Sequence, residues 1–140
     1  MVNTTYGLIC SSISGIICSM VLHKGKMNIE QVLNATLAGG VMMGSSADMI
    51  VSPFISLIIG LSAGVISTLG FHIFEHVLFK YLKLHDTCGV AYLHFIPGLL
   101  GGLIACLIAG ATPEEKFGSD ITSVFPMMGA NRGNSKQGGI

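Results

Sequence analysis

Four long apolar segments follow one another along the chain, at residues 6–22, 31–51, 54–79 and 89–111. A helix needs about 20 residues to cross ~30 Å of hydrocarbon at ~1.5 Å per residue, and each segment is close to that length. A backbone in lipid has no water to satisfy its polar groups, so each segment must be helical. The pattern predicts an all-α, polytopic transmembrane helix bundle with four spans.

Composition supports the bilayer as the solvent for this chain. Charged residues make up 10% of the 140 residues and apolar residues 51%, with a mean hydropathy of +0.73. Soluble domains carry about 25% charged residues, which form the hydrated shell that this sequence lacks. Seven basic and seven acidic residues give a formal net charge of zero, so nucleic acid is not expected as a partner.

Basic residues predict the orientation of the bundle. They follow the first and third segments, at Lys24, Lys26, Lys80 and Lys83. Loops rich in Lys and Arg remain on the cytoplasmic side, so four crossings place both chain ends on the extracellular side. We expect residues 1–126 to form the membrane domain. Residues 127–140 are polar and rich in Gly, Asn and Ser, which predicts an extracellular loop or tail.

Glycines spaced four residues apart predict close helix packing. Three such pairs lie in apolar segments: Gly40 with Gly44, Gly60 with Gly64, and Gly98 with Gly102. GxxxG pairs let helix backbones approach closely in membranes, because no side chain separates them. Three pairs in three segments therefore indicate a compact bundle.

His94 is the first candidate for chemistry, because it lies inside the fourth apolar segment. A neutral imidazole donates from one nitrogen and accepts at the other, so it can pass a small polar molecule along a pore. Pro97 has no N–H, which would leave the Leu93 carbonyl free in a regular helix. The alternative is a structural histidine that is hydrogen-bonded to a neighbouring helix, and the sequence leaves both readings open.

Two aspartates are further candidates. Asp86 precedes the fourth segment, where its carboxylate is expected to cap the helix and also to attract a cation in a cytoplasmic vestibule. Eight residues separate it from His94, or ~12 Å along a helix, so direct contact is not expected. Asp48 lies near the outer end of the second segment, where it either reaches the membrane interface or attracts cations at the outer mouth.

A peptidase is a third class of function to weigh. His72, Glu75 and His76 spell HxxEH, a pattern that also occurs in inverzincin metallopeptidases. A polar helix end that meets water explains the same residues more simply, and no distant acidic ligand completes a zinc site. The four cysteines form no CxxC pair and are interpreted as small apolar filler. We therefore expect no metal, no cofactor and no enzymatic activity.

Two motifs carry a resemblance to a known family. The stretch Asn34–Val41 reads NATLAGGV, and Asp86–Gly98 reads DTCGVAYLHFIPG. Both resemble stretches of Rh (Rhesus) glycoproteins, and the combination is highly specific to the Rh and ammonium transporter family. The likeness covers about residues 3–110 and returns near residues 132–138.

The resemblance implies a homotrimer of polytopic subunits in the plasma membrane, with ammonium or ammonia as the substrate and a pore through each subunit. Family members are thought to remove a proton from ammonium and pass neutral ammonia between two pore histidines on different helices. His94 matches the second of these histidines, and Asp86 matches an acidic position in the cytoplasmic vestibule.

The chain departs from the family pattern at several places. A family subunit has many more spans than four, and the helix with the first pore histidine and the outer phenylalanine gate are missing. Phe95 stands where the family usually has Gly, Ala91 and Tyr92 replace a more polar pair, and Asn28 stands where some Rh proteins carry Asp. The candidates for pore-adjacent or packing positions are Phe95, Asn28, Asp48 and Gly98. The alternative function is therefore a non-conducting, truncated membrane protein that acts as an interaction subunit.

Overall fold

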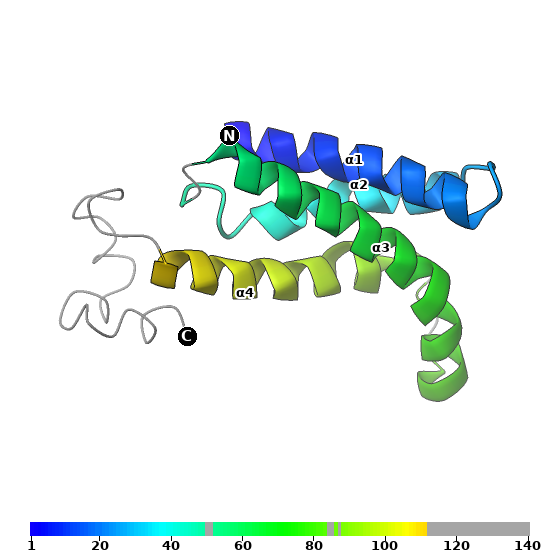
Figure 1. Cartoon of the computed structure of the whole chain (residues 1–140). Coiled ribbons are helices and arrows are strands. Elements are labelled where there is room, and N and C mark those ends of the chain that lie inside the picture. The colour runs from blue at the N-terminus through cyan, green and yellow to red at the C-terminus, as the bar shows by residue number, and fades with distance from the viewer. Residues whose placement is uncertain (50–51, 84–85, 87, 112–140) are drawn as a thin grey trace.

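The computed structural model describes residues 1–49, 52–83, 86 and 88–111, without the side chains of residues 74–76, 78 and 82. Its elements are α1 (Val2–Leu22), α2 (Ile29–Met43), α3 (Pro53–Leu82), the π-helix η1 (Ala91–Phe95) and α4 (Ile96–Ala111). The helices run alternately in opposite directions, so the N-terminus and the end of α4 lie at the same end (Figure 1). These residues contain no strand, which confirms the all-α prediction.

The turn between α1 and α2 follows directly from its sequence. Gly25 takes a positive φ of 88°, and its N–H donates to the Met20 carbonyl at 2.8 Å, as in a glycine-terminated helix end. Asn28 then caps α2, because its side-chain oxygen accepts from the N–H groups of Glu30 and Gln31. A helix stop and a helix start therefore lie within a few residues of each other.

Helices α1, α2 and α3 pack through small residues. A Cβ added at Gly60 of α3 would lie 2.6 Å from the Gly7 carbonyl oxygen of α1, and one at Gly39 of α2 would meet the same oxygen. A Cβ added at Gly64 of α3 would likewise meet the Ser11 carbonyl oxygen of α1. The three backbones approach so closely that larger side chains cannot fit between them. Close contact between backbones stabilises the bundle through dispersion forces. This matters in lipid, because lipid tails are as apolar as the helices and the hydrophobic effect does not drive helices together.

Serine hydroxyls add hydrogen bonds within this small-residue core. The fully buried Ser11 donates across the interface to the Ala35 carbonyl oxygen of α2. Ser12 instead donates to Leu8 of its own helix, and Thr68 donates to Gly64 of its own helix, each within 2.8 Å. Bonds of the second kind bend helices, and α3 curves away from α1 along its second half (Figure 1).

The predicted glycine pairs are correct on α3, half correct on α2 and wrong on α4. Gly60 and Gly64 both face α1, as expected. On α2 a Cβ at Gly40 would lie 2.9 Å from Cδ2 of Leu8 on α1, and a Cβ at Gly44 would meet only carbonyls of its own helix. The closest approach to the α1 backbone belongs to Gly39. On α4 it belongs to Gly101, where a Cβ would lie 2.6 Å from the Met42 carbonyl oxygen. Spacing alone does not specify which face of a glycine-rich helix meets a neighbour.

Three helices are long and apolar enough to cross a membrane within the described ranges: Val2–Leu22, Pro53–Ile73 and Ala91–Ala111. The second predicted span, residues 31–51, yields the 15-residue helix α2, which covers ~22 Å. It ends at Met43, eight residues before the expected boundary, because Gly44, Ser45 and Ser46 begin a series of turns. The count of four spans stays a prediction, and the predicted tail at residues 127–140 lies outside the described residues.

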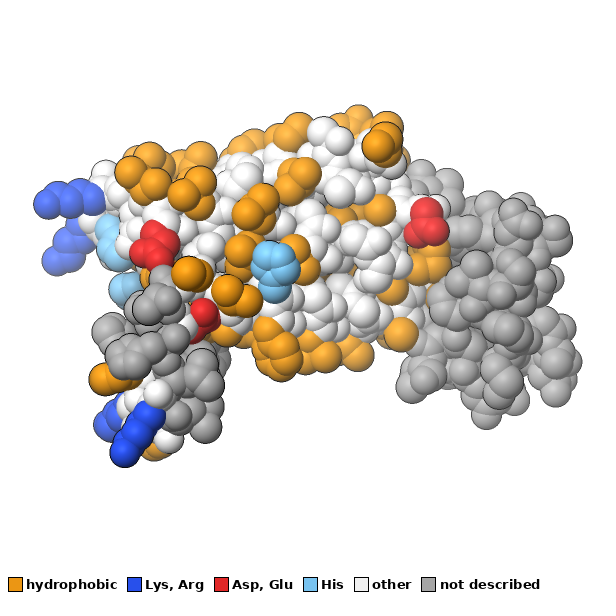
Figure 2. Space-filling model, turned by 180° about the vertical axis from the view of Figure 1, so that it is seen from behind, with side chains coloured by type: hydrophobic (Ala, Val, Ile, Leu, Met, Phe, Trp, Pro, Cys, Tyr) orange, Lys and Arg blue, Asp and Glu red, His pale blue; other side chains and the backbone are white. Residues whose placement is uncertain are grey.

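Apolar side chains cover the outside of the bundle between two polar ends. Figure 2 shows this apolar surface, with the coloured lysines of the described residues at one end. Lys24 and Lys26 lie at the α1–α2 turn, at the same end as the last turns of α3 (Figure 1). Among the described residues, large apolar side chains that face outward outnumber the buried apolar ones, for example Ile17 at 58% and Leu107 at 71% exposure. This distribution fits a helix bundle in lipid.

Candidate functional site

His94 lies in η1, a π-helical turn that leads directly into α4. The turn is fixed at its start by Asp86, whose two carboxylate oxygens accept from Val90 N–H at 2.9 Å and Ala91 N–H at 2.7 Å. Its π character is carried by the N–H of Ile96, which donates to the Ala91 carbonyl five residues earlier. Such turns are rare in helices and are frequent at functional sites.

Gly89 brings this turn close to the core. Its φ is +67°, and an added Cβ would lie 2.8 Å from a ring carbon of Phe71 and against the side-chain amide of Asn34. The Gly89 carbonyl accepts from both Tyr92 at 3.1 Å and Leu93 at 2.9 Å. A side chain at this position would push η1 away from α2 and α3, so glycine is required here.

The contacts of α2 show the depth of His94 in the bundle. Gly89 lies against Asn34, while Gly101 lies against Met42. His94 comes between these two levels, which bracket the middle of α2, and the middle of α2 packs against the middle of α1. The start of α4 accordingly lies at about the level of the central part of α1 along the bundle (Figure 1). His94 therefore lies near the mid-depth of the bundle.

The imidazole of His94 points outward from the bundle. Its neighbours Tyr92 and Leu93 are buried, whereas His94 and Phe95 are exposed, Phe95 by 69%. Figure 2 shows a histidine side chain surrounded by apolar side chains on the face turned toward the viewer. An ionisable group on an apolar surface at membrane depth is costly unless a pore or a further helix covers it. This face is therefore where a substrate path fits best.

Asp86 lies toward the lysine-rich end, three residues before Gly89 and partly exposed. The predicted capping role is what the geometry shows, since both carboxylate oxygens accept backbone N–H groups. The carboxylate is still partly exposed, toward the lysine-bearing end of the segment that carries His94. Capping and the attraction of cations are compatible, because each oxygen has a second lone pair.

The remaining sequence candidates lie at different places. Phe95 points away from the helices and fills no interface between the described elements. Gly98 is exposed too, and an added Cβ would make an ordinary 3.8 Å contact with Val41. Asp48 is exposed in the turns after α2, near Ala47, whose carbonyl oxygen accepts from Asn3 at 2.8 Å. Asp48 is thus at the end opposite to the lysine-bearing α1–α2 turn.

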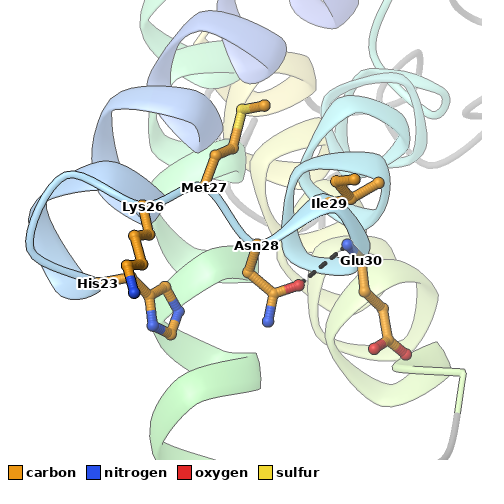
Figure 3. A pocket seen from close by; sticks show the side chains of 6 residues that line it. All are labelled: His23, Lys26, Met27, Asn28, Ile29 and Glu30. Atoms are coloured by element: carbon orange, nitrogen blue, oxygen red, sulfur yellow. Dashed lines mark hydrogen bonds between the residues drawn. The ribbon is translucent and has the colours of Figure 1, made fainter.

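Asn28 serves the α1–α2 turn rather than the face that carries His94. Its side chain caps α2, and its backbone N–H donates to the Ser19 hydroxyl at 3.1 Å. It lines an open hollow of about 470 Å³ together with His23, Lys26, Met27, Ile29 and Glu30 (Figure 3). Neither His94 nor Asp86 borders this hollow.

A polar network at the same turn was not predicted from the sequence. The side-chain oxygen of the buried Gln31 lies 3.0 Å from Nε2 of His23 and 3.3 Å from the Ser19 hydroxyl. The His23 ring also meets the His72 ring edge to face, with centroids 5.5 Å apart. The sequence signal for this network was Gln31, a polar residue at the start of the second apolar segment. A side-chain amide that is buried there requires hydrogen-bond partners.

The HxxEH motif lies on α3, but only His72 of the motif's three polar residues has a described side chain. The side chains of Glu75 and His76 lie outside the described part of the structure. No group of three or more His, Cys, Asp or Glu side chains that could hold a metal ion occurs among the described residues. His72 contacts His23 instead.

An integral membrane helix bundle with an outward-facing mid-depth histidine defines the class of this protein. The family model for the Ammonium Transporter Family matches residues 1–134. The chain is 41% identical over 134 residues to the ammonium transporter Rh type B of Sus scrofa, which covers 95% of this chain and 29% of that protein. It is 43% identical to the Rh type B protein of Oryctolagus cuniculus, over 90% of this chain and 28% of that protein.

A solved structure agrees with this result. The chain resembles Nitrosomonas europaea Rh50, described as a conduction channel of the Rhesus protein family, with a TM-score of 0.73 and 38% identity. The match covers 99% of this chain and 34% of Rh50. This chain belongs to the ammonium transporter family, and it spans less than a third of the length of the Rh type B relatives named above. The predicted resemblance to Rh proteins is confirmed.

Proposed function

We propose that this chain forms part of an ammonium channel, in which His94 contributes one wall of a path for neutral ammonia. The observation that carries the proposal is the exposed His94 at mid-depth on an otherwise apolar face, in a member of a transporter family. This function is that of a transporter and not of an enzyme. No resident cofactor or metal is required.

The chemistry of the face fits neutral ammonia better than the ammonium ion. An unpaired cation in hydrocarbon is very costly, while a small neutral molecule with a few hydrogen bonds is not. The imidazole of His94 can accept from ammonia at one nitrogen and donate to it at the other. Asp86 lies toward the end that the lysines mark as cytoplasmic, where its charge would raise the local concentration of ammonium.

No described helix covers His94, so the other wall of the path comes from outside the described residues. In the Rh type B relatives the matching region is under a third of the protein, so further helices of a longer subunit are the natural source. We propose a homotrimeric assembly in the plasma membrane, with the α1–α2 turn cytoplasmic. Asp48 then lies at the extracellular side.

Ammonia flux into liposomes tests this function. The protein that carries this chain is reconstituted, and internal alkalinisation is followed after an ammonium gradient is applied. Wild type is expected to exceed protein-free liposomes, and His94→Ala to lose most of this flux. Leu107→Ala, on an exposed position of the same helix, is the control and should conduct like wild type. Flux that is equal in wild type and His94→Ala would refute the role of His94.

A further inference from the structure

Tyr92 departs from the burial pattern of a regular helix. Every fourth residue is buried along η1 and α4, at Leu93, Pro97, Gly101, Ala105 and Ala109, as in an α-helix. Tyr92 is also fully buried, although it precedes Pro97 by five positions. In a regular α-helix, side chains five positions apart point ~140° away from each other. The wider π turn brings Tyr92, beside Leu93, to the side that faces α2 and α3.

The ring of Tyr92 fits a slot on α3. A Cβ added at Gly70 would lie 3.0 Å from Cδ1 of this ring, so the missing side chain of Gly70 makes the slot. Phe71 closes one side of it, with the two rings edge to face and their centroids 5.9 Å apart. Tyr92 is the largest fully buried side chain in the described part of the chain. Its removal from the slot would therefore leave a large void.

Tyr92 and His94 belong to the same five-residue turn. If the turn relaxed to an α-helix, the residues before Pro97 would rotate by about 100° relative to α4. His94 would then leave the exposed face. The slot at Gly70 prevents this rotation, because the Tyr92 ring can enter it only from the π turn.

We infer that Tyr92 is a positioning residue, which holds the π turn through its fit against Gly70 and Phe71 and thereby aims His94 at the substrate path. Tyr92 touches no substrate in this scheme, and it acts only through the direction of His94. The inference rests on the proposed function for its consequence in transport. Its structural part, the direction of the His94 ring, stands independently of transport.

Two readouts on the reconstituted protein separate these parts. The first is the NMR signal of the His94 imidazole nitrogens, assigned with His94→Gln, and the second is the pH profile of ammonia flux. Tyr92→Leu is expected to shift or broaden the His94 signal and to lower flux roughly tenfold or more, because small misplacements of a reacting group are costly. Tyr92→Phe keeps the ring and should retain both.

Gly70→Ala is the milder second variant, because its added methyl group displaces the ring without emptying the slot. It should move the His94 signal in the same direction as Tyr92→Leu, by less. Gly44→Ala is the matched control, since the added Cβ there approaches only carbonyls of its own helix.

An unchanged His94 signal in folded Tyr92→Leu would overturn the inference, and so would a Tyr92→Phe variant as impaired as Tyr92→Leu. If wild type shows no flux while the NMR pattern is as expected, the proposed function fails and the positioning role remains.

Discussion

The α1–α3 core and the η1–α4 segment pack in opposite ways. In the core, glycine meets backbone from three helices at Gly7, Gly39 and Gly60, and no added atom fits. Along α4 only one side is held, by Gly101 and its buried neighbours, while Phe95 and Leu107 are 69% and 71% exposed. The first region is packed on the inside by backbone from three helices, and the second is packed along one side only.

The difference separates stability from function in this chain. A tightly packed core tolerates no change of volume, so its residues specify how the helices assemble. The open side holds His94, on a turn built from a glycine, an aspartate cap and a buried tyrosine. Substitutions in the two regions should therefore fail in different ways.

The largest effect is expected from Gly64→Leu in the core. Its Cβ would overlap the Ser14 hydroxyl and the Ser11 carbonyl oxygen, and the carbonyl is backbone of a packed helix that cannot move aside. We expect a loss of stability at the upper end of the ~1–3 kcal/mol typical of overpacking. Unfolding in mixed micelles measures this loss. Gly102→Leu on α4, where nothing lies within 4 Å, should be nearly neutral, and an equal loss in both would contradict the comparison.

Gly89→Ala should have the next largest effect, on the turn that carries His94. The substitution forces a side chain onto a φ of +67° and against Phe71. Left-handed backbone alone costs ~1–2 kcal/mol, and the clash adds to it. Gly25→Ala is the control, because its φ is +88° but nothing lies within 4 Å of the added Cβ. The difference in unfolding free energy between the two variants isolates the packing of η1. No difference would mean that η1 does not press on α2 and α3.

Asp86 tests whether capping and charge can be separated. Asp86→Ala should lose ~1 kcal/mol of stability with the cap, while Asp86→Asn keeps one accepting oxygen and should lose less. Both remove the negative charge, so both should lower ammonium uptake at low substrate concentration. Asn28→Ala removes a cap on α2 and should cost similar stability without this effect on uptake. Normal uptake in Asp86→Asn would limit Asp86 to capping.

Phe95→Ala is expected to have the smallest effect on stability. The ring is mostly exposed and fills no interface in the described bundle, so its removal should change unfolding by less than ~0.5 kcal/mol. If the ring narrows the path beside His94, ammonia flux should rise. A clear loss of stability in the reconstituted protein would show instead that Phe95 packs against a helix from outside this chain.

Much of the fold was predictable from apolar segment length, because the backbone in lipid must be helical. The family was predictable from Asn34–Val41 and Asp86–Gly98, whose order and spacing are specific. The Asp86 cap was predicted correctly. The early end of α2 and the tight glycines Gly39 and Gly101 were missed, since hydropathy does not report which side of a helix meets a neighbour.

The sequence by itself determined the helices, the membrane class and the residues available for chemistry. These features depend on composition and on the spacing of residues along the sequence. Only the tertiary structure decided that Tyr92 is buried five positions before Pro97 and that His94 consequently points outward. The physical reason is that the backbone hydrogen bond of a π turn joins residues five positions apart, whereas that of an α-helix joins residues four positions apart. Its stability comes from a slot at Gly70, a residue far away in the sequence.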